Sequence, residues 1–93
     1  MIYMDDKHFN ILKNIFEKYN YHFYAFGSRV LGNHKKYSDI DIFFCENIPQ
    51  KIIYSLEEEF EESDLPFKVD LIDYQKCDAD FQTIMTRSYI QIQ

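Results

Sequence analysis

The stretch that decides the fold is "GSRVLGNHKKYSDIDIFF", from Gly27 to Phe44. It contains both glycines of the 93-residue chain, at positions 27 and 32. They are followed by two aspartates, Asp39 and Asp41, which are separated by a single residue in an otherwise apolar run. Glycine permits sharp turns and close contacts, whereas paired carboxylates in an apolar strand repel each other. The stretch therefore indicates a functional site as well as a turn.

The two aspartates predict a metal site. In a strand, Asp39 and Asp41 leave the same face, roughly 6–7 Å apart along the chain. Mg²⁺ would relieve their repulsion, because it prefers carboxylate oxygens together with the oxygens of a bound phosphate. Asp70, in the run "KVDLI", adds a third carboxylate if its strand is a neighbour in the sheet, with Asp73 as the alternative. Three carboxylates can hold two metal ions, roughly 3.5–4 Å apart, for an in-line displacement at phosphorus.

The glycines predict a phosphate cradle next to that metal site. Gly27 lets the chain turn from a strand into a helix, and its missing side chain lets a phosphate approach the backbone. Ser28 supplies a hydroxyl and an N–H group at the start of the short helix. Gly32 ends that helix, so that the chain can return into the strand of the aspartates. Ser38, just before Asp39, is a further candidate for nucleotide binding; the alternative is that its hydroxyl only caps or bonds the turn.

The remaining sequence predicts an alternation of helices and strands in one domain, residues 1–93. The expected class is α+β (α/β-type), a small mixed β-sheet with helices packed against it. Asn47 is expected to cap the third helix, with Pro49 near its first position. The expected elements are a helix from Asp5 or Asp6 to about residue 20, a strand over 21–26, a helical turn over 28–31, a strand over 38–46, a helix after 49, a strand over 65–74 and a final helix over 78–92.

Charge and composition exclude several classes of protein. The formal net charge is −6, with much of it in the run from Glu57 to Asp64, whereas a protein that grips a long nucleic acid needs a basic surface. The acidic run is either a solvated helix face or a docking surface for a basic partner. No membrane span or signal peptide is expected, since no apolar run approaches 18 residues. Cys45 and Cys77 are expected to be reduced, partly buried thiols of a cytoplasmic protein.

The segment "GSRVLGNHKKYSDIDI" resembles the signature of the DNA-polymerase-β-like nucleotidyltransferase superfamily. That signature is Gly-Ser, a glycine four residues after the serine, and then Ser-Asp-x-Asp. The chain is most similar to the minimal members, the MNT proteins, which are stand-alone domains found beside HEPN-domain proteins in prokaryotes. The resemblance extends over nearly the whole chain, through Asp70 to the closing "MTRSYIQI".

The resemblance implies the polymerase-β-like nucleotidyltransferase fold and Mg²⁺-dependent transfer of a nucleoside monophosphate, with release of pyrophosphate. Asp39 and Asp41 would bind both metal ions. Asp70 would complete one metal site and help to activate the acceptor hydroxyl. The pair Gly27 and Ser28 would hold the triphosphate.

The resemblance also implies a donor, a partner and an acceptor. ATP is the expected donor, and Arg29 would either add a phosphate contact or face solvent. The expected partner is a HEPN-domain toxin, and the expected acceptor is a tyrosine of that toxin, which makes this chain the antitoxin. Two alternatives remain open. The chain could neutralise its partner by binding alone, or it could be the catalytic subunit of a two-protein enzyme that modifies a small molecule.

Overall fold

A four-stranded mixed sheet forms the centre of the computed structural model, which describes residues 2–93. The strand order is β3-β2-β1-β4. Strands β2 and β3 are parallel, whereas β1 pairs antiparallel with both β2 and β4. The strands are β1 (Tyr24–Phe26), β2 (Ile40–Phe44), β3 (Val69–Asp73) and β4 (Tyr89–Gln91). This arrangement confirms the α+β class with a small mixed sheet.

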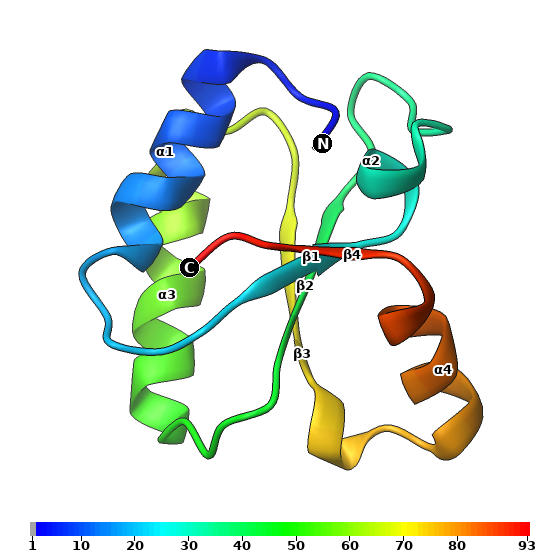
Figure 1. The fold of residues 1–93 in the computed structure, drawn as a ribbon. Coiled ribbons are helices and arrows are strands. Elements are labelled where there is room, and N and C mark those ends of the chain that lie inside the picture. The colour runs from blue at the N-terminus through cyan, green and yellow to red at the C-terminus, as the bar shows by residue number, and fades with distance from the viewer. Residues whose placement is uncertain (1) are drawn as a thin grey trace.

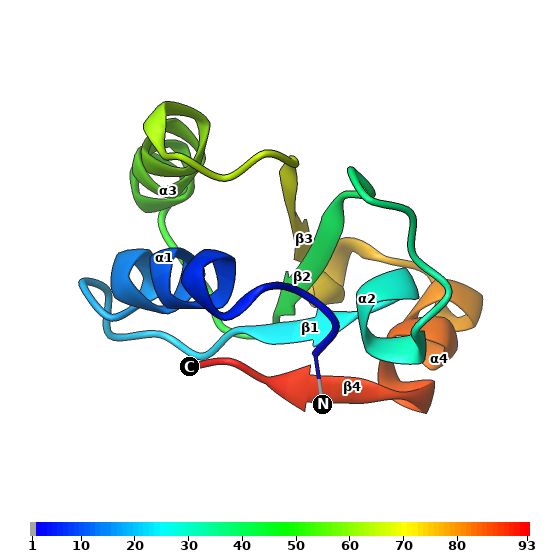
Figure 2. The same ribbon diagram turned by 90° about the horizontal axis from the view of Figure 1, so that it is seen from above.

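Helices lie on both sides of the sheet (Figures 1 and 2). Helices α1 (Asp6–Phe16) and α3 (Gln50–Glu62) pack side by side over one face. Helix α4 (Ala79–Arg87) lies on the other face, and the four-residue α2 (Ser28–Leu31) follows directly after β1. A 3₁₀ turn, Tyr74–Lys76, leads from β3 towards α4. No helix within residues 2–93 is both long enough and apolar enough to span a bilayer.

The face covered by α1 and α3 holds the larger core. The apolar residues of α1 recur at helical spacing, so that Leu12, Ile15 and Phe16 all point inward. Phe16 stacks on Phe23 with ring centroids 4.2 Å apart, and it contacts Phe60 of α3 edge-on at 5.1 Å. Most of the buried apolar side chains of the chain belong to this cluster, which fixes the sheet against the two helices.

The opposite face holds a smaller core and the acidic residues. Along β2, Ile40 and Ile42 belong to the larger cluster, and because side chains alternate, Asp41 and Phe43 point the other way. Phe43 joins Phe26 and Met85 in a second buried cluster beneath α4. The strand periodicity therefore places apolar packing on one side of β2 and a carboxylate on the other.

The expected final helix over 78–92 is wrong in its second half. Helix α4 ends at Arg87, Ser88 adopts an extended conformation, and β4 follows. The pairs Tyr24↔Gln91 and Phe26↔Tyr89 join β4 to the otherwise open edge of β1. From Tyr89 to Ile92 the segment "YIQI" alternates exposed and more buried side chains, which suits a strand, and tertiary pairing prevails over continuation of the helix.

Other boundaries shift by a few residues, and two further expectations are corrected. The strands expected over 21–26, 38–46 and 65–74 are shorter, and α1 ends before residue 20. Asn47 does not cap α3, because the residue before the helix is Pro49, whose carbonyl accepts bonds from Ile52 N and Ile53 N. Cys45 is exposed rather than partly buried, and Cys77 is half-buried.

Candidate active site

The parallel pairing of β2 and β3 brings two of the predicted carboxylates together. Asp41 pairs in register with Asp70, so both side chains leave the sheet on the α4 side. Asp39 lies two residues before Asp41, just ahead of β2, and it is exposed. Asp73 lies an odd number of residues from Asp70, and its carboxylate accepts the N–H of Gln75 at 3.0 Å. The Asp73 side chain therefore stabilises the turn that follows β3 and points away from Asp41 and Asp70.

The electrostatics of Asp41 are unfavourable without a cation. Burial raises the pKa of the Asp41 carboxyl, and the neighbouring charges of Asp70 and then Asp39 raise it further. The ion pairs within residues 2–93 join His8 to Asp5, Lys18 to Glu59 and His22 to Glu46, so none of them neutralises this site. Burial and the neighbouring charges thus disfavour the ionised form of Asp41, and such perturbed carboxylates are typical of functional sites.

Gly27 is required where β1 turns into α2. Its φ of 83° and ψ of −153° lie in a region that side chains rarely permit. A Cβ atom at this position would lie 2.6 Å from Oδ2 of Asp41, so the backbone and the carboxylate are in direct contact. The Gly27 carbonyl accepts bonds from Val30 N and Leu31 N, which begins α2 with Ser28 as its first residue. The turn at Gly27 thus places the start of α2 beside Asp41.

Gly32 ends α2, as its sequence position predicts. It has a left-handed conformation with a φ of 87°, and its N–H bonds the Ser28 carbonyl at 2.8 Å. A Cβ atom here would lie 3.2 Å from the ring of Tyr3. The two glycines therefore bracket a single helical turn, and only Gly27 contacts an acidic residue.

Arg29 has a structural environment. Its side chain is 3% exposed, and its guanidinium lies 4.1 Å from the ring centroid of Phe67. It donates to the carbonyl oxygens of Ser38 at 3.0 Å, Tyr3 at 3.0 Å and Lys36 at 3.1 Å. The expectation that Arg29 faces solvent is wrong, and its three carbonyl partners favour a role in holding the loop before β2 over a phosphate contact.

Ser38 takes part in the same loop. Its hydroxyl accepts the N–H of Lys35 at 2.7 Å, and its own N–H bonds the Lys35 carbonyl at 3.1 Å. This is the turn bond that the sequence offered as the alternative to nucleotide binding. Together with Arg29, Ser38 determines where the chain enters β2 and hence where Asp39 lies.

A hollow of about 270 Å³ lies beside Asp41. Its walls include the turn at Gly27 and the corner between α4 and β4, where Arg87 and Ser88 lie. The remaining lining is apolar and comes from Phe26, Leu31 and Ile84. Arg87 is absent from the sequence-based prediction of the site, because a continuous helix over 78–92 gives no reason to place it near Gly27.

The donor set suits a hard divalent cation, although it is incomplete as it stands. Asp39, Asp41 and Asp70 supply only carboxylate oxygens, which Mg²⁺ prefers. Within residues 2–93, however, no three acidic, histidine or cysteine side chains converge closely enough to form a metal-ligand cluster. The expected convergence of three carboxylates is therefore limited to the adjacent pair and Asp39 nearby, which leaves coordination positions for phosphate oxygens and water.

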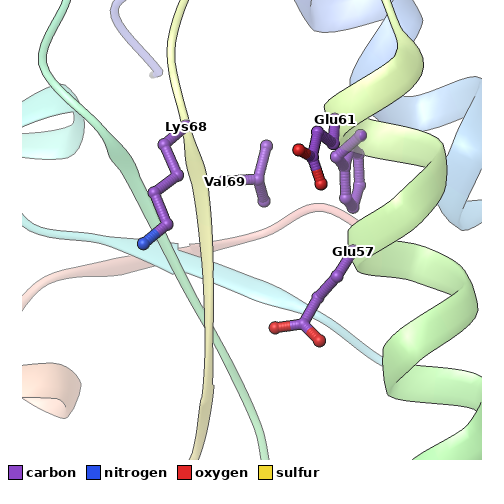
Figure 3. Close-up of a pocket in the computed structure, with 5 residues that line it drawn as sticks. Glu57, Glu61, Lys68 and Val69 are labelled. Atoms are coloured by element: carbon purple, nitrogen blue, oxygen red, sulfur yellow. The ribbon is translucent and has the colours of Figure 1, made fainter.

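A larger hollow than the one beside Asp41 lies elsewhere in the protein. It has a volume of about 470 Å³ and lies between α3 and the edge strand β3, lined by Glu57, Phe60, Glu61, Lys68 and Val69. In Figure 3 the two glutamates extend from α3 towards β3, while Lys68 points away from them. This hollow is on the α1/α3 side of the sheet, the face opposite to Asp41, so size alone does not identify the active site.

Comparison with known proteins defines the class. The family model for the nucleotidyltransferase domain matches residues 6–92, and the chain therefore belongs to the nucleotidyltransferase family of enzymes. The predicted resemblance to minimal nucleotidyltransferases is confirmed. Among particular relatives, the chain is 41% identical over 87 residues to a probable protein adenylyltransferase, MntA, of Haemophilus influenzae, covering 89% of this chain and 76% of that protein.

A solved structure supports the fold. The chain resembles one chain in a crystal structure of a toxin–antitoxin complex with AMP-PNP, with a TM-score of 0.68 and 21% sequence identity. The likeness covers 91% of this chain and 72% of that one. At this identity the match establishes a shared fold.

Proposed function

We propose that this domain is an antitoxin that adenylylates its toxin. In this proposal it transfers AMP from ATP, with Mg²⁺, to a tyrosine hydroxyl of a HEPN-domain partner in the cytoplasm. The relative named a probable protein adenylyltransferase supports the reaction class, and the toxin–antitoxin neighbour supports the biological setting. The tyrosine and the HEPN partner rest on the resemblance to MNT proteins.

A single observation carries the proposal: Asp41 lies in register with Asp70 and in contact with the turn at Gly27. This carboxylate pair forms no ion pair within residues 2–93, and together with the adjacent bare stretch of backbone it can accommodate metal ions and a phosphate group. Asp39, Asp41 and Asp70 would hold the metal, which neutralises the phosphate charge and favours ionisation of the acceptor hydroxyl. We retain Asp70, rather than Asp73, as the third carboxylate.

The remaining roles belong to the residues of the chain itself. Asp70, next to Asp41 on the open face, accepts the proton of the acceptor hydroxyl and passes it to solvent. The acceptor oxygen then bonds to the α-phosphorus of ATP as the bond to the β-phosphate breaks, and pyrophosphate leaves. Gly27 and Ser28 bind the triphosphate, because no Cβ atom at Gly27 keeps the phosphates away from the backbone. Most of the catalysis comes from positioning and charge neutralisation.

Intact-mass spectrometry of the co-purified partner tests this function. The complex is incubated with Mg²⁺ and each nucleoside triphosphate in turn, using wild-type chain, Asp39→Ala and Asp41→Asn. We expect the partner to gain the mass of one or more AMP groups with ATP, and the gain to disappear in both variants. Peptide mapping then identifies the modified residue.

The alternatives predict different results. If the partner gains no mass but is still inhibited by Asp41→Asn, the chain acts by binding alone and the enzymatic proposal fails. Modification of an added small hydroxyl compound, with the partner unmodified, would instead indicate a two-protein enzyme that acts on small molecules.

A further inference from the structure

The hollow beside Asp41 contains a cation that the proposed roles leave unused. Arg87 lines this hollow, is exposed, and has no hydrogen bond or ion pair with the residues that the structure describes. Arginine guanidinium is always charged and can bind two oxygens of one phosphate at once. An arginine side chain without a partner among the described residues, next to a turn proposed to bind phosphate, is therefore a candidate phosphate ligand.

The register of the sheet is what brings Arg87 to this position. Tyr89 of β4 pairs with Phe26 of β1, and the two strands are antiparallel. Just beyond this pair, β1 continues into Gly27, while in the other strand Ser88 and Arg87 precede Tyr89. The corner between α4 and β4 consequently lies against the turn between β1 and α2, and both contribute to one hollow.

The charge of the site calls for a cation at this place. Asp70 and Asp39 already place two further negative charges near Asp41, none of the three forms an ion pair within residues 2–93, and a triphosphate adds more negative charge. Arg29 is buried and bonded to carbonyl oxygens, so it is poorly placed to compensate. Lys36 lines a different hollow, together with Arg29 and Phe67. Arg87 is the basic residue among those lining the hollow with Gly27 and Asp41.

We propose that Arg87 binds the β- and γ-phosphates of the nucleoside triphosphate in this hollow. The inference rests on the proposed function and extends it to a residue from the other end of the chain. The α-phosphate has to lie at the carboxylates, where transfer occurs, so the outer phosphates extend along the turn at Gly27 towards Arg87. The same contact holds the pyrophosphate as it leaves.

A purely structural role for Arg87 makes a different prediction. A basic residue in the last turn of a helix interacts favourably with the helix dipole, typically by a few tenths of a kcal/mol. In that case, replacing Arg87 would lower the thermal stability slightly and leave nucleotide affinity unchanged. A phosphate contact instead affects ATP and leaves AMP nearly unaffected, because AMP lacks the outer phosphates.

Calorimetric binding measurements distinguish the two roles. Wild type, Arg87→Ala, Arg87→Gln and Arg87→Lys are titrated with a non-transferable ATP analogue and with AMP, both with Mg²⁺. Lys51→Ala on α3, which lies on the opposite face of the sheet, makes the same change in net charge and is the control. We expect Arg87→Ala and Arg87→Gln to weaken binding of the analogue about tenfold or more, with AMP binding changed less than about twofold. Arg87→Lys should restore part of the affinity.

Steady-state transfer to the partner gives a second measurement. Arg87→Ala should raise KM for ATP more than it lowers kcat, since the contact exists in the ground state as well as in the transition state. Circular dichroism confirms that each variant is folded, and if Arg87→Ala is not, Arg87→Gln decides. Unchanged affinity for the ATP analogue in a folded Arg87 variant would overturn this inference and leave the proposed function intact. Failure of the wild-type chain to bind the analogue would overturn both.

Discussion

The two faces of the sheet serve different ends. On the α1/α3 face the buried residues form one continuous apolar cluster with two well-packed helices. On the α4 face the buried cluster consists of Phe26, Phe43 and Met85. The adjacent positions hold Asp41 and Asp70, neither of which forms an ion pair with the residues that the structure describes. One face buries most of the apolar side chains, and the other holds an open anionic site in which burial and neighbouring charges disfavour the ionised form of Asp41. Strand β2 contributes to both faces, because its side chains alternate: Ile40 and Ile42 enter the larger apolar cluster, and Asp41 points to the other face.

The largest expected effect comes from the apolar face. Leu56 of α3 is fully buried, and Leu56→Ala should lower the free energy of unfolding by about 2–5 kcal/mol. Met85 is equally buried on the other face, but it belongs to a smaller cluster that can relax, so Met85→Ala should cost less. Urea denaturation of both variants measures the difference. Equal losses would mean that the two faces contribute similarly to stability.

A smaller effect is expected at the turn beside Asp41. Gly27→Ala forces a side chain into a glycine-only conformation and against Oδ2 of Asp41, so it should cost about 1–3 kcal/mol and abolish ATP binding. Gly32→Ala is the matched control, since Gly32 also has a positive φ but contacts only Tyr3. The control should lose stability and still bind ATP. If both variants bind ATP normally, the contact between Gly27 and Asp41 has no part in the nucleotide site.

Removing charge from the acidic face should stabilise the protein. Asp41→Asn removes a carboxylate that burial and its neighbours disfavour, so we expect a gain of about 0.5–2 kcal/mol at neutral pH without metal. Because the folded state raises the pKa of Asp41, the wild type gains stability as the pH falls through that folded-state value. The difference in unfolding free energy between Asp41→Asn and wild type should therefore become smaller at acidic pH.

The melting temperatures of wild type and Asp41→Asn, measured across pH, test this prediction. A second comparison repeats the measurement with Mg²⁺ and ATP. Mg²⁺ with ATP should raise the melting temperature of the wild type more than that of Asp41→Asn, since the ligand relieves the same repulsion. An Asp41→Asn variant that is less stable than wild type at neutral pH would contradict the view that burial and neighbouring charges disfavour the ionised form of Asp41.

The smallest expected effect is on the outer surface of α3. Hydrogen bonds from Lys18 and then Tyr19 lower the pKa of Glu59, which is the opposite direction to Asp41. Glu59→Gln should cost no more than about 1 kcal/mol at neutral pH. The loss should vanish as the pH falls through the pKa of Glu59 in the folded protein, because protonation removes the same interaction. Glu58→Gln, at an exposed position, is the control. If the difference in unfolding free energy between wild type and Glu59→Gln did not change with pH, the interaction of Glu59 with Lys18 and Tyr19 would not stabilise the protein.

Much of the fold and site could be predicted from local signals. The helices α1 and α3 follow from their apolar spacing, and the strand–turn–helix at Gly27 follows from the position of the glycines. The prediction that Asp70 neighbours Asp41 depended on the strand order, which the structure now provides. The roles of Arg29 and Ser38 could not be assigned in advance, because the three carbonyl oxygens that Arg29 bonds come from two segments that only the fold brings together.

The resemblance of the sequence to a known family predicted the class of enzyme. The sequence pattern by itself determined the alternation that puts Asp41 on the other face of β2 from Ile40 and Ile42, and the turn that requires Gly27. These two are local properties, since they depend on side-chain period and backbone conformation over a few residues. Only the tertiary structure decided the conformation of residues 88–92. Pairing with the edge of β1 makes Tyr89–Gln91 a strand, β4, where the sequence predicted the end of a helix. That pairing also brought Arg87 beside Gly27, because hydrogen bonds between strands join residues regardless of their separation along the chain.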